Sequence, residues 1–196
     1  MVSLSKGQKI SLDKGMQLCL VGLGWDPNRY RGNHDFDLDA SVFLLGANGK
    51  VASEDDIVYF GNQTHVSGAV KSLGDDRSGD SSDGGDDEQI YINLSRVPAH
   101  VQKIVIAITI YDAENREQNF GHISNAFVRV VKVKSENDEN GEEVVRYDLD
   151  EEFEDETAVV ACEITRNGSE WKFGAVGMGY ECELEGICNL YGLYFD

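Results

Sequence analysis

The feature of this sequence that most restricts its fold is the recurrence of short apolar runs in which polar and apolar residues alternate with a period of two. Turn-forming pairs such as Asn140-Gly141 and Asn167-Gly168 separate these runs. A chain of many short strands joined by such turns predicts an all-β sandwich or barrel. The predicted strands are Gln17–Val21, Phe36–Leu45, Ile90–Leu94, Lys103–Tyr111, Phe127–Val133, Val144–Tyr147, Val159–Thr165 and Trp171–Val176.

Helical signals are few and short. Asp148 and Glu151 have the spacing of a capping box, which predicts a short acidic helix starting there. A helical turn is also expected within Asn115–Asn119. Four apolar residues near the end of the sequence share one helical face: Leu184, Ile187, Cys188 and Tyr191. Since no proline-rich linker divides the chain, we expect residues 1–196 to form a single domain.

The charge balance restricts the partners. The chain has 36 acidic and 17 basic residues, a formal net charge of −19. Nucleic acids and anionic membranes bind basic surfaces, so neither is an expected partner, whereas cations and basic proteins are. No apolar stretch has the length of a signal peptide core or of a membrane-spanning helix, so we expect a soluble cytoplasmic protein without membrane insertion.

The four cysteines are expected to be free thiols, in keeping with that location. Cys19 and Cys162 lie within predicted strands and are interpreted as small core residues. Cys182 and Cys188 are separated by five residues, a spacing that matches no tight zinc-binding pair.

The first candidate site is a row of aspartates, Asp35, Asp37 and Asp39, opposite the apolar face of a predicted strand. Aspartate is depleted in strands and neighbouring carboxylates repel, so the row suggests a cation site; a solvated strand face is the alternative. In a straight strand Asp35 and Asp39 lie about 13 Å apart, which is too far for both to bind one ion. Either the strand bends, or the row serves two ions, or only part of it binds.

The second candidate site is the segment Gly74–Glu88, in which seven carboxylates alternate with four glycines. Glycine permits tight turns, and aspartate supplies the hard oxygen ligands that calcium requires in numbers of six to eight. A solvated acidic loop is the alternative. An EF-hand is excluded, because Ala40 or Ser81 would occupy its glycine position.

Enzyme motifs are absent from the sequence. His34, His65, His100 and His122 form no HExxH pair, and there is no nucleophile elbow. Gly22-Leu23-Gly24 lacks the third glycine of a dinucleotide fingerprint. Catalysis by paired carboxylates stays open as an alternative.

The order of the motifs resembles the TerD family of tellurite-resistance and general stress proteins, over nearly the whole chain. The residues that carry the resemblance are Gly22-Leu23-Gly24-Trp25-Asp26, Asp35-Phe36-Asp37-Leu38-Asp39-Ala40-Ser41, Gly85-Asp86-Asp87-Glu88, Ser3–Gly7, Thr109–Asp112, Gln118–Gly121 and Gly168–Phe173. One stretch, Asp80–Gly84, looks longer than the loop usual in the family.

The resemblance implies a β-sandwich of two mainly antiparallel sheets with a few short helices, and two calcium ions held near one end. It also implies cytoplasmic association with other Ter-family proteins and a membrane-associated partner. The metal ligands that it implies are Asp26, Asp35, Asp37, Asp39, Asp75, Asp76, Asp80, Asp83, Asp86, Asp87 and Glu88.

The hypothesis is therefore a calcium-dependent interaction module with no enzymatic activity. Calcium would offset the mutual repulsion of these carboxylates, order the acidic loop and present a surface to partners. The alternatives are an acidic scaffold that binds a basic protein without calcium, and a metal-dependent hydrolase.

Overall fold

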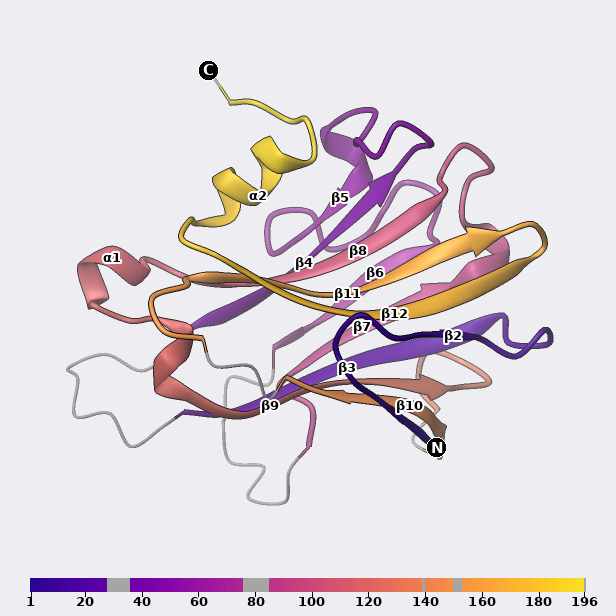
Figure 1. Cartoon of the computed structure of the whole chain (residues 1–196). Coiled ribbons are helices and arrows are strands. Elements are labelled where there is room, and N and C mark those ends of the chain that lie inside the picture. Colours follow the sequence, from indigo (N-terminus) through magenta and orange to yellow (C-terminus); the bar gives the residue numbers. More distant parts are fainter. Residues whose placement is uncertain (28–35, 76–84, 139, 150–152, 196) are drawn as a thin grey trace.

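The computed structural model describes residues 1–27, 36–75, 85–138, 140–149 and 153–195. Within these residues the chain forms two six-stranded sheets that pack face to face (Figure 1). The predicted β-sandwich is confirmed.

The first sheet has the strand order β1-β10-β9-β3-β7-β6. β1 pairs with β10 in parallel, and the other described strands of the sheet pair in antiparallel fashion. The strands are β1 (Val2–Leu4), β3 (Leu18–Pro27), β6 (Val70–Asp75), β7 (Glu88–Asn93), β9 (Ile123–Lys132) and β10 (Glu142–Asp148).

The second sheet has the order β2-β12-β11-β8-β4-β5, and its described pairings are antiparallel. Its strands are β2 (Lys9–Ser11), β4 (Leu38–Leu45), β5 (Ile57–Val58), β8 (Lys103–Ile110), β11 (Ala158–Asn167) and β12 (Glu170–Tyr180). Five short helical segments connect or follow the described strands: η1 (Glu54–Asp56), η2 (Leu94–Arg96), α1 (Ala113–Arg116), η3 (Phe120–His122) and α2 (Leu184–Leu190).

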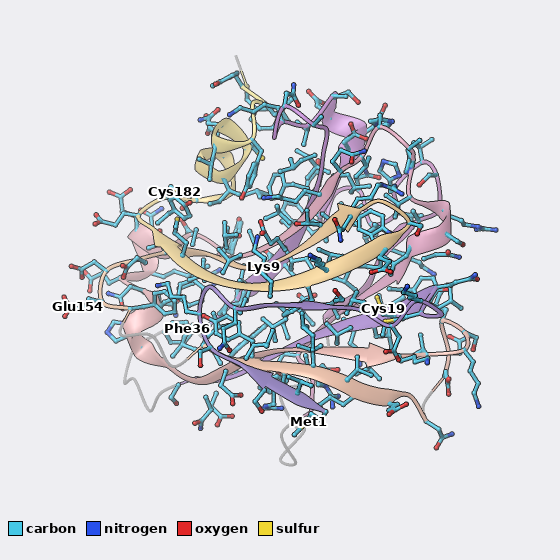
Figure 2. All side chains as sticks on the ribbon, turned by 45° about the vertical axis from the view of Figure 1, so that its right-hand side comes forward. Met1, Lys9, Cys19, Phe36, Glu154 and Cys182 are labelled. Atoms are coloured by element: carbon cyan, nitrogen blue, oxygen red, sulfur yellow. The ribbon has the colours of Figure 1, made fainter. Side chains whose placement is uncertain are left out.

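The main core lies between the two sheets and consists mostly of aliphatic and aromatic side chains. Side chains fill the space between the ribbons in Figure 2. Cys19 and Cys162 are fully buried in it, which confirms their interpretation as core residues. Burial raises the pKa of Cys19 to about 12, so this thiol stays protonated and unreactive at neutral pH. Cys182 and Cys188 are also free, and Cys182 is partly exposed.

A second apolar cluster covers the outer face of the second sheet. Phe43 and Val105, on β4 and β8, point away from the main core and pack with Ile187 and Cys188 of α2. The helix lies on the outer side of this sheet (Figure 1). It has seven residues, and no helix in the described part of the chain is long and apolar enough to span a bilayer.

The eight strands predicted from alternation are all present. The strands that were missed, β1, β2, β5 and β6, lie at sheet edges and have two to six residues. The helix predicted to begin at Asp148 is wrong at that residue, because Asp148 ends β10; residues 150–152 lie outside the described part. The C-terminal helix is confirmed, and the turn expected at Asn115–Asn119 begins earlier, as α1.

Substituting Ile187 tests how much α2 contributes to the fold. Ile187 is fully buried, so Ile187→Ala should lower the free energy of unfolding by about 2 to 4 kcal/mol through lost burial and a residual cavity. Leu190→Ala, in the same helix at a side chain 39% exposed, should cost less than about 1 kcal/mol. Urea denaturation would measure both. Equal costs would show that α2 does not pack on the sheet as described.

Candidate functional site

The described residues of the two acidic segments lie at one end of the sandwich. β3 ends and β7 begins there, with Leu23 opposite Glu88 in the register. β4 begins at the same end, because Phe36 makes an edge-to-face contact with His122, just before β9. This acidic end is defined by the described carboxylates of Asp26, Asp37, Asp39, Asp86, Asp87 and Glu88.

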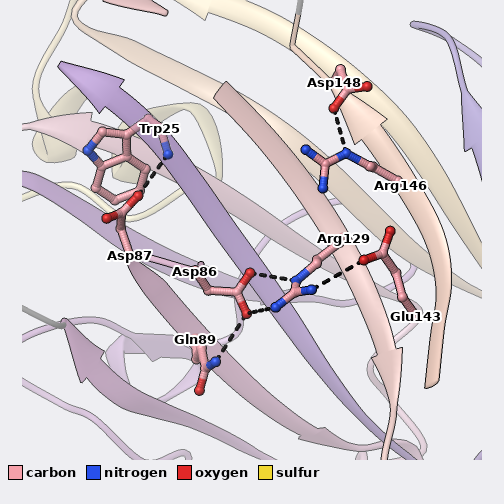
Figure 3. Close-up of polar contacts among 8 residues, drawn as sticks. All are labelled: Trp25, Asp86, Asp87, Gln89, Arg129, Glu143, Arg146 and Asp148. Atoms are coloured by element: carbon pink, nitrogen blue, oxygen red, sulfur yellow. Dashed lines mark hydrogen bonds and ion pairs between the residues drawn. The ribbon is translucent and has the colours of Figure 1, made fainter. Parts of the chain in front are cut away.

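Asp86 is the most firmly held carboxylate at the acidic end. Its side chain is only 2% exposed, and its two oxygens accept hydrogen bonds from Arg129 Nε at 2.7 Å and Nη2 at 3.0 Å. Gln89 Nε2 donates to it at 3.0 Å, and Arg129 also reaches Glu143 at 3.2 Å (Figure 3). The hydrogen bond to Asp86 raises the pKa of Arg129, against the opposing effect of burial. This bidentate pair joins the segment before β7 to β9.

Two glycines of β3 make room for this arrangement. A Cβ atom on Gly22 would overlap the Asp86 carboxylate, and one on Gly24 would overlap the Phe127 ring and approach the Gly85 carbonyl oxygen to 2.9 Å. Gly22 and Gly24 are therefore packing residues at which side chains and backbone approach closely. Close packing therefore explains Gly22 and Gly24, which resemble part of a dinucleotide-binding motif.

Asp87 and Glu88 are also held by the protein. The Trp25 backbone N–H donates to Asp87 Oδ2 at 2.8 Å, and the Asp87 N–H donates to the Leu23 carbonyl at 2.8 Å. Glu88 is buried at the start of β7. These contacts fix the course of the backbone into β7.

Asp26 and Asp37 are the exposed carboxylates of the acidic end. Asp26 Oδ2 accepts a hydrogen bond from Asn125 Nδ2 at 2.7 Å. The Asp37 side chain is 52% exposed, and its nearest described cation, Arg116 Nη1, is 3.9 Å away. Asp39 lies on β4, partly buried between the buried Leu38 and Ala40. Asp37 precedes this strand and Asp35 lies outside the described residues, so Asp39 is the one member of the predicted row that the structure describes on the strand.

The donor chemistry of the acidic end fits calcium in part. Asp26 and Asp37 offer hard, solvent-accessible oxygens, whereas both oxygens of Asp86 already accept hydrogen bonds from Arg129. Among the residues that the structure describes, no three acidic, histidine or cysteine side chains lie close enough to hold a metal ion.

The remaining predicted ligands lie at the edge of the described residues or outside them. Asp75 ends β6, paired with Glu88, and the structure describes only its backbone. Asp35, Asp76, Asp80 and Asp83 lie outside the described residues. Calcium binding by the eleven predicted ligands therefore stays a prediction.

Sequence reasoning missed Arg129, the partner of Asp86. The signal was present, because Arg129 alternates with the buried Val128 and Val130 on a strand that is otherwise largely apolar. An arginine at such a position suggests a carboxylate partner on a neighbouring segment. The sequence does not say which of the 36 acidic residues that partner is.

Removing the arginine tests the role of this ion pair in the fold. Arg129→Met would leave the Asp86 carboxylate buried without its charge partner, and should lower the free energy of unfolding by about 3 to 5 kcal/mol. Lys132→Met, on the same strand and 3.7 Å from the exposed Asp13, should cost less than about 1 kcal/mol. Denaturant titration of the two variants measures the difference. A similar small cost for both variants would show that the ion pair between Arg129 and Asp86 does not stabilise the fold.

Comparison with known proteins agrees with the motifs and the fold. The sequence matches the TerD domain family over residues 1–191. It is 51% identical to general stress protein 16U of Bacillus subtilis (strain 168), over 98% of this chain and 97% of that protein. It is 48% identical to the tellurium resistance protein TerD of Serratia marcescens, with the same coverage of both chains.

A solved structure shows the same fold. It is the crystal structure of a homologue of the telluride resistance protein TerD from Streptomyces coelicolor A3(2), which superposes with a TM-score of 0.66 at 21% identity. The superposition covers 89% of this chain and 96% of that one. From the family match over residues 1–191 and the close relatives together, we conclude that the chain belongs to the TerD family of tellurium-resistance and stress-response proteins.

Proposed function

We propose that this protein acts in the response to tellurium or other stress as a calcium-dependent interaction module. The observation that supports the proposal is that Asp26, on β3, and Asp37, directly before β4, both expose their carboxylates at the same end of the sandwich. The relatives are named for tellurium resistance and general stress, and we assign the chain no catalytic step.

The described residues of the acidic end would divide into ligands and supports. Asp26, Asp37 and Asp39 would offer oxygens to calcium, together with backbone carbonyls. Asp86, bound by Arg129, and Asp87, bound to the Trp25 N–H, would fix the backbone on which further ligands depend. The other ligands of this proposal are Asp35, Asp75, Asp76, Asp80, Asp83 and Glu88.

Bound calcium would supply positive charge where the chain concentrates negative charge. With a net charge of −19, this protein repels acidic partners, and the acidic end adds to that repulsion. Neutralising this end would allow a partner to dock there, in our proposal another Ter-family protein or a membrane-associated protein in the cytoplasm. An acidic scaffold that binds basic partners without calcium is the alternative that the experiments below separate.

Calcium titration is the direct test. Protein stripped with chelator should bind about two calcium ions, measured by isothermal calorimetry, and should melt at a higher temperature when saturated. Magnesium at the same concentration should have little effect, because it requires a smaller and more rigid octahedral site. Absence of saturable binding would exclude the calcium-dependent module and favour the scaffold.

Two substitutions should separate a ligand from a support. Asp37→Asn should lower calcium affinity by about tenfold or more while leaving the melting temperature of the stripped protein nearly unchanged, because Asp37 is half exposed. Asp86→Asn should lower the melting temperature even without calcium, because it weakens a buried ion pair. Asp13→Asn, at the exposed partner of Lys132, is the matched control. Unchanged calcium affinity in Asp37→Asn would remove this residue from the site.

A further inference from the structure

A groove unrelated to the acidic end lies on the outer face of the second sheet. It has a volume of about 350 Å³ and separates α2 and the residues after it from η1 and β5. Figure 1 shows α2 and β5 on the same side of this sheet. The volume falls at the lower end of the range for ligand pockets, roughly 300 to 1,000 Å³. Apolar side chains supply much of its lining: Ile57, Tyr59, Leu184, Cys188, Leu193 and Phe195.

The charged residues that line the groove are all acidic. They are Glu54 and Asp55 on one wall and Glu185 on the other. None of the three carboxylates forms an ion pair in the part of the chain that the structure describes. The neighbouring cation Lys50 donates to the Leu190 carbonyl at 2.7 Å, at the far end of α2.

The wall that carries Glu54 and Asp55 is fixed from within. Asp56, buried behind them, accepts the Ala52 N–H at 3.0 Å and is bonded to the buried His65 Nε2 at 3.1 Å. His65 Nδ1 is in turn bonded to Ser67 Oγ at 2.7 Å. Because these contacts hold η1 in place, the two carboxylates face the groove without the entropy cost of ordering a loop.

Exposed aromatic residues line the groove or are next in sequence to residues that line it. Phe60, which packs edge-on against Tyr59, is 63% exposed, and Tyr194 and Phe195 are 72% and 52% exposed. Large apolar side chains in contact with water are costly when clustered, and such patches mark interaction sites. The apolar lining suits a ligand with an aliphatic part, and the carboxylates suit a ligand with a positive charge.

We propose that this groove binds a basic segment of a partner protein, with an arginine or lysine flanked by aliphatic residues. The aliphatic stem of the basic side chain would lie against Tyr59 and Leu184, and its cationic head would reach Glu54, Asp55 and Glu185. Acidic segments are repelled by the same carboxylates. The groove lies away from the acidic end, so its occupant requires no calcium.

Peptide binding in the presence of chelator tests this proposal. The probe is the acetylated and amidated tripeptide Leu-Arg-Leu, and the control is the same peptide with citrulline, a neutral isostere of arginine. Titration into ¹⁵N-labelled protein should shift the backbone resonances of Ile57, Leu184 and Leu193 in a saturable way. The arginine peptide should bind at least about fivefold more tightly than the citrulline peptide, because exposed ion pairs are individually weak but three carboxylates act together.

Matched variants separate this groove from the general acidity of the chain. The triple substitution Glu54→Gln, Asp55→Asn and Glu185→Gln should remove the advantage of the arginine peptide. Glu114→Gln, Glu117→Gln and Glu154→Gln, at exposed positions in and directly after α1 and before β11, remove the same charge and should preserve it. Phe195→Ala should weaken both peptides. Equal binding of the two peptides, equal loss in both triple variants, or shifts spread over the whole surface would each overturn the proposal.

Discussion

The buried ion pair between Asp86 and Arg129 is the interaction on which the acidic end depends. It requires glycine at position 22, because the carboxylate occupies the space of a side chain there, and it connects the entry of β7 with β3 and β9. The contacts of Asp86 also position the next two residues. Asp87 accepts a hydrogen bond from the Trp25 N–H, and Glu88 pairs with Leu23 at the start of β7. In a protein with a net charge of −19, one partly buried arginine thus offsets the charge repulsion that acts on this acidic segment.

Negative charge serves different purposes on the two surfaces described. At the acidic end, exposed carboxylates stand beside polar groups and backbone, the setting in which a small hard cation competes well with water. In the groove beside α2, carboxylates border an apolar floor, where a long side chain with an aliphatic stem and a charged head is the better match. Under the two proposals, the same residue types would bind different cations, because the neighbouring side chains differ.

The central strands could be predicted from the sequence, whereas the edges and the contacts between segments could not. β8 was recognisable because its residues are apolar almost without interruption, which also agrees with its burial on both faces. β1, β2 and β5 are too short to show alternation, and Gly22 and Gly24 concealed the second half of β3. The first acidic segment was recognisable from the alternation of its aspartates with apolar residues, and the second from its composition. The pairing of Asp86 with Arg129, and of Asp56 with His65, depends on tertiary contacts that no local pattern encodes.

The pairing of the first strands has a consequence for synthesis on the ribosome. Val2 in β1 lies opposite Val145, and Lys9 in β2 lies opposite Gly174, so β1 and β2 can pair only after β10 and β12 have been made. The outer face of the second sheet is likewise covered only when α2 emerges. A nascent chain therefore exposes unpaired strand edges and an uncovered apolar sheet until β10, β12 and α2 have been made. Until these partners form, the exposed strand edges and the apolar sheet face are surfaces through which incomplete chains can associate.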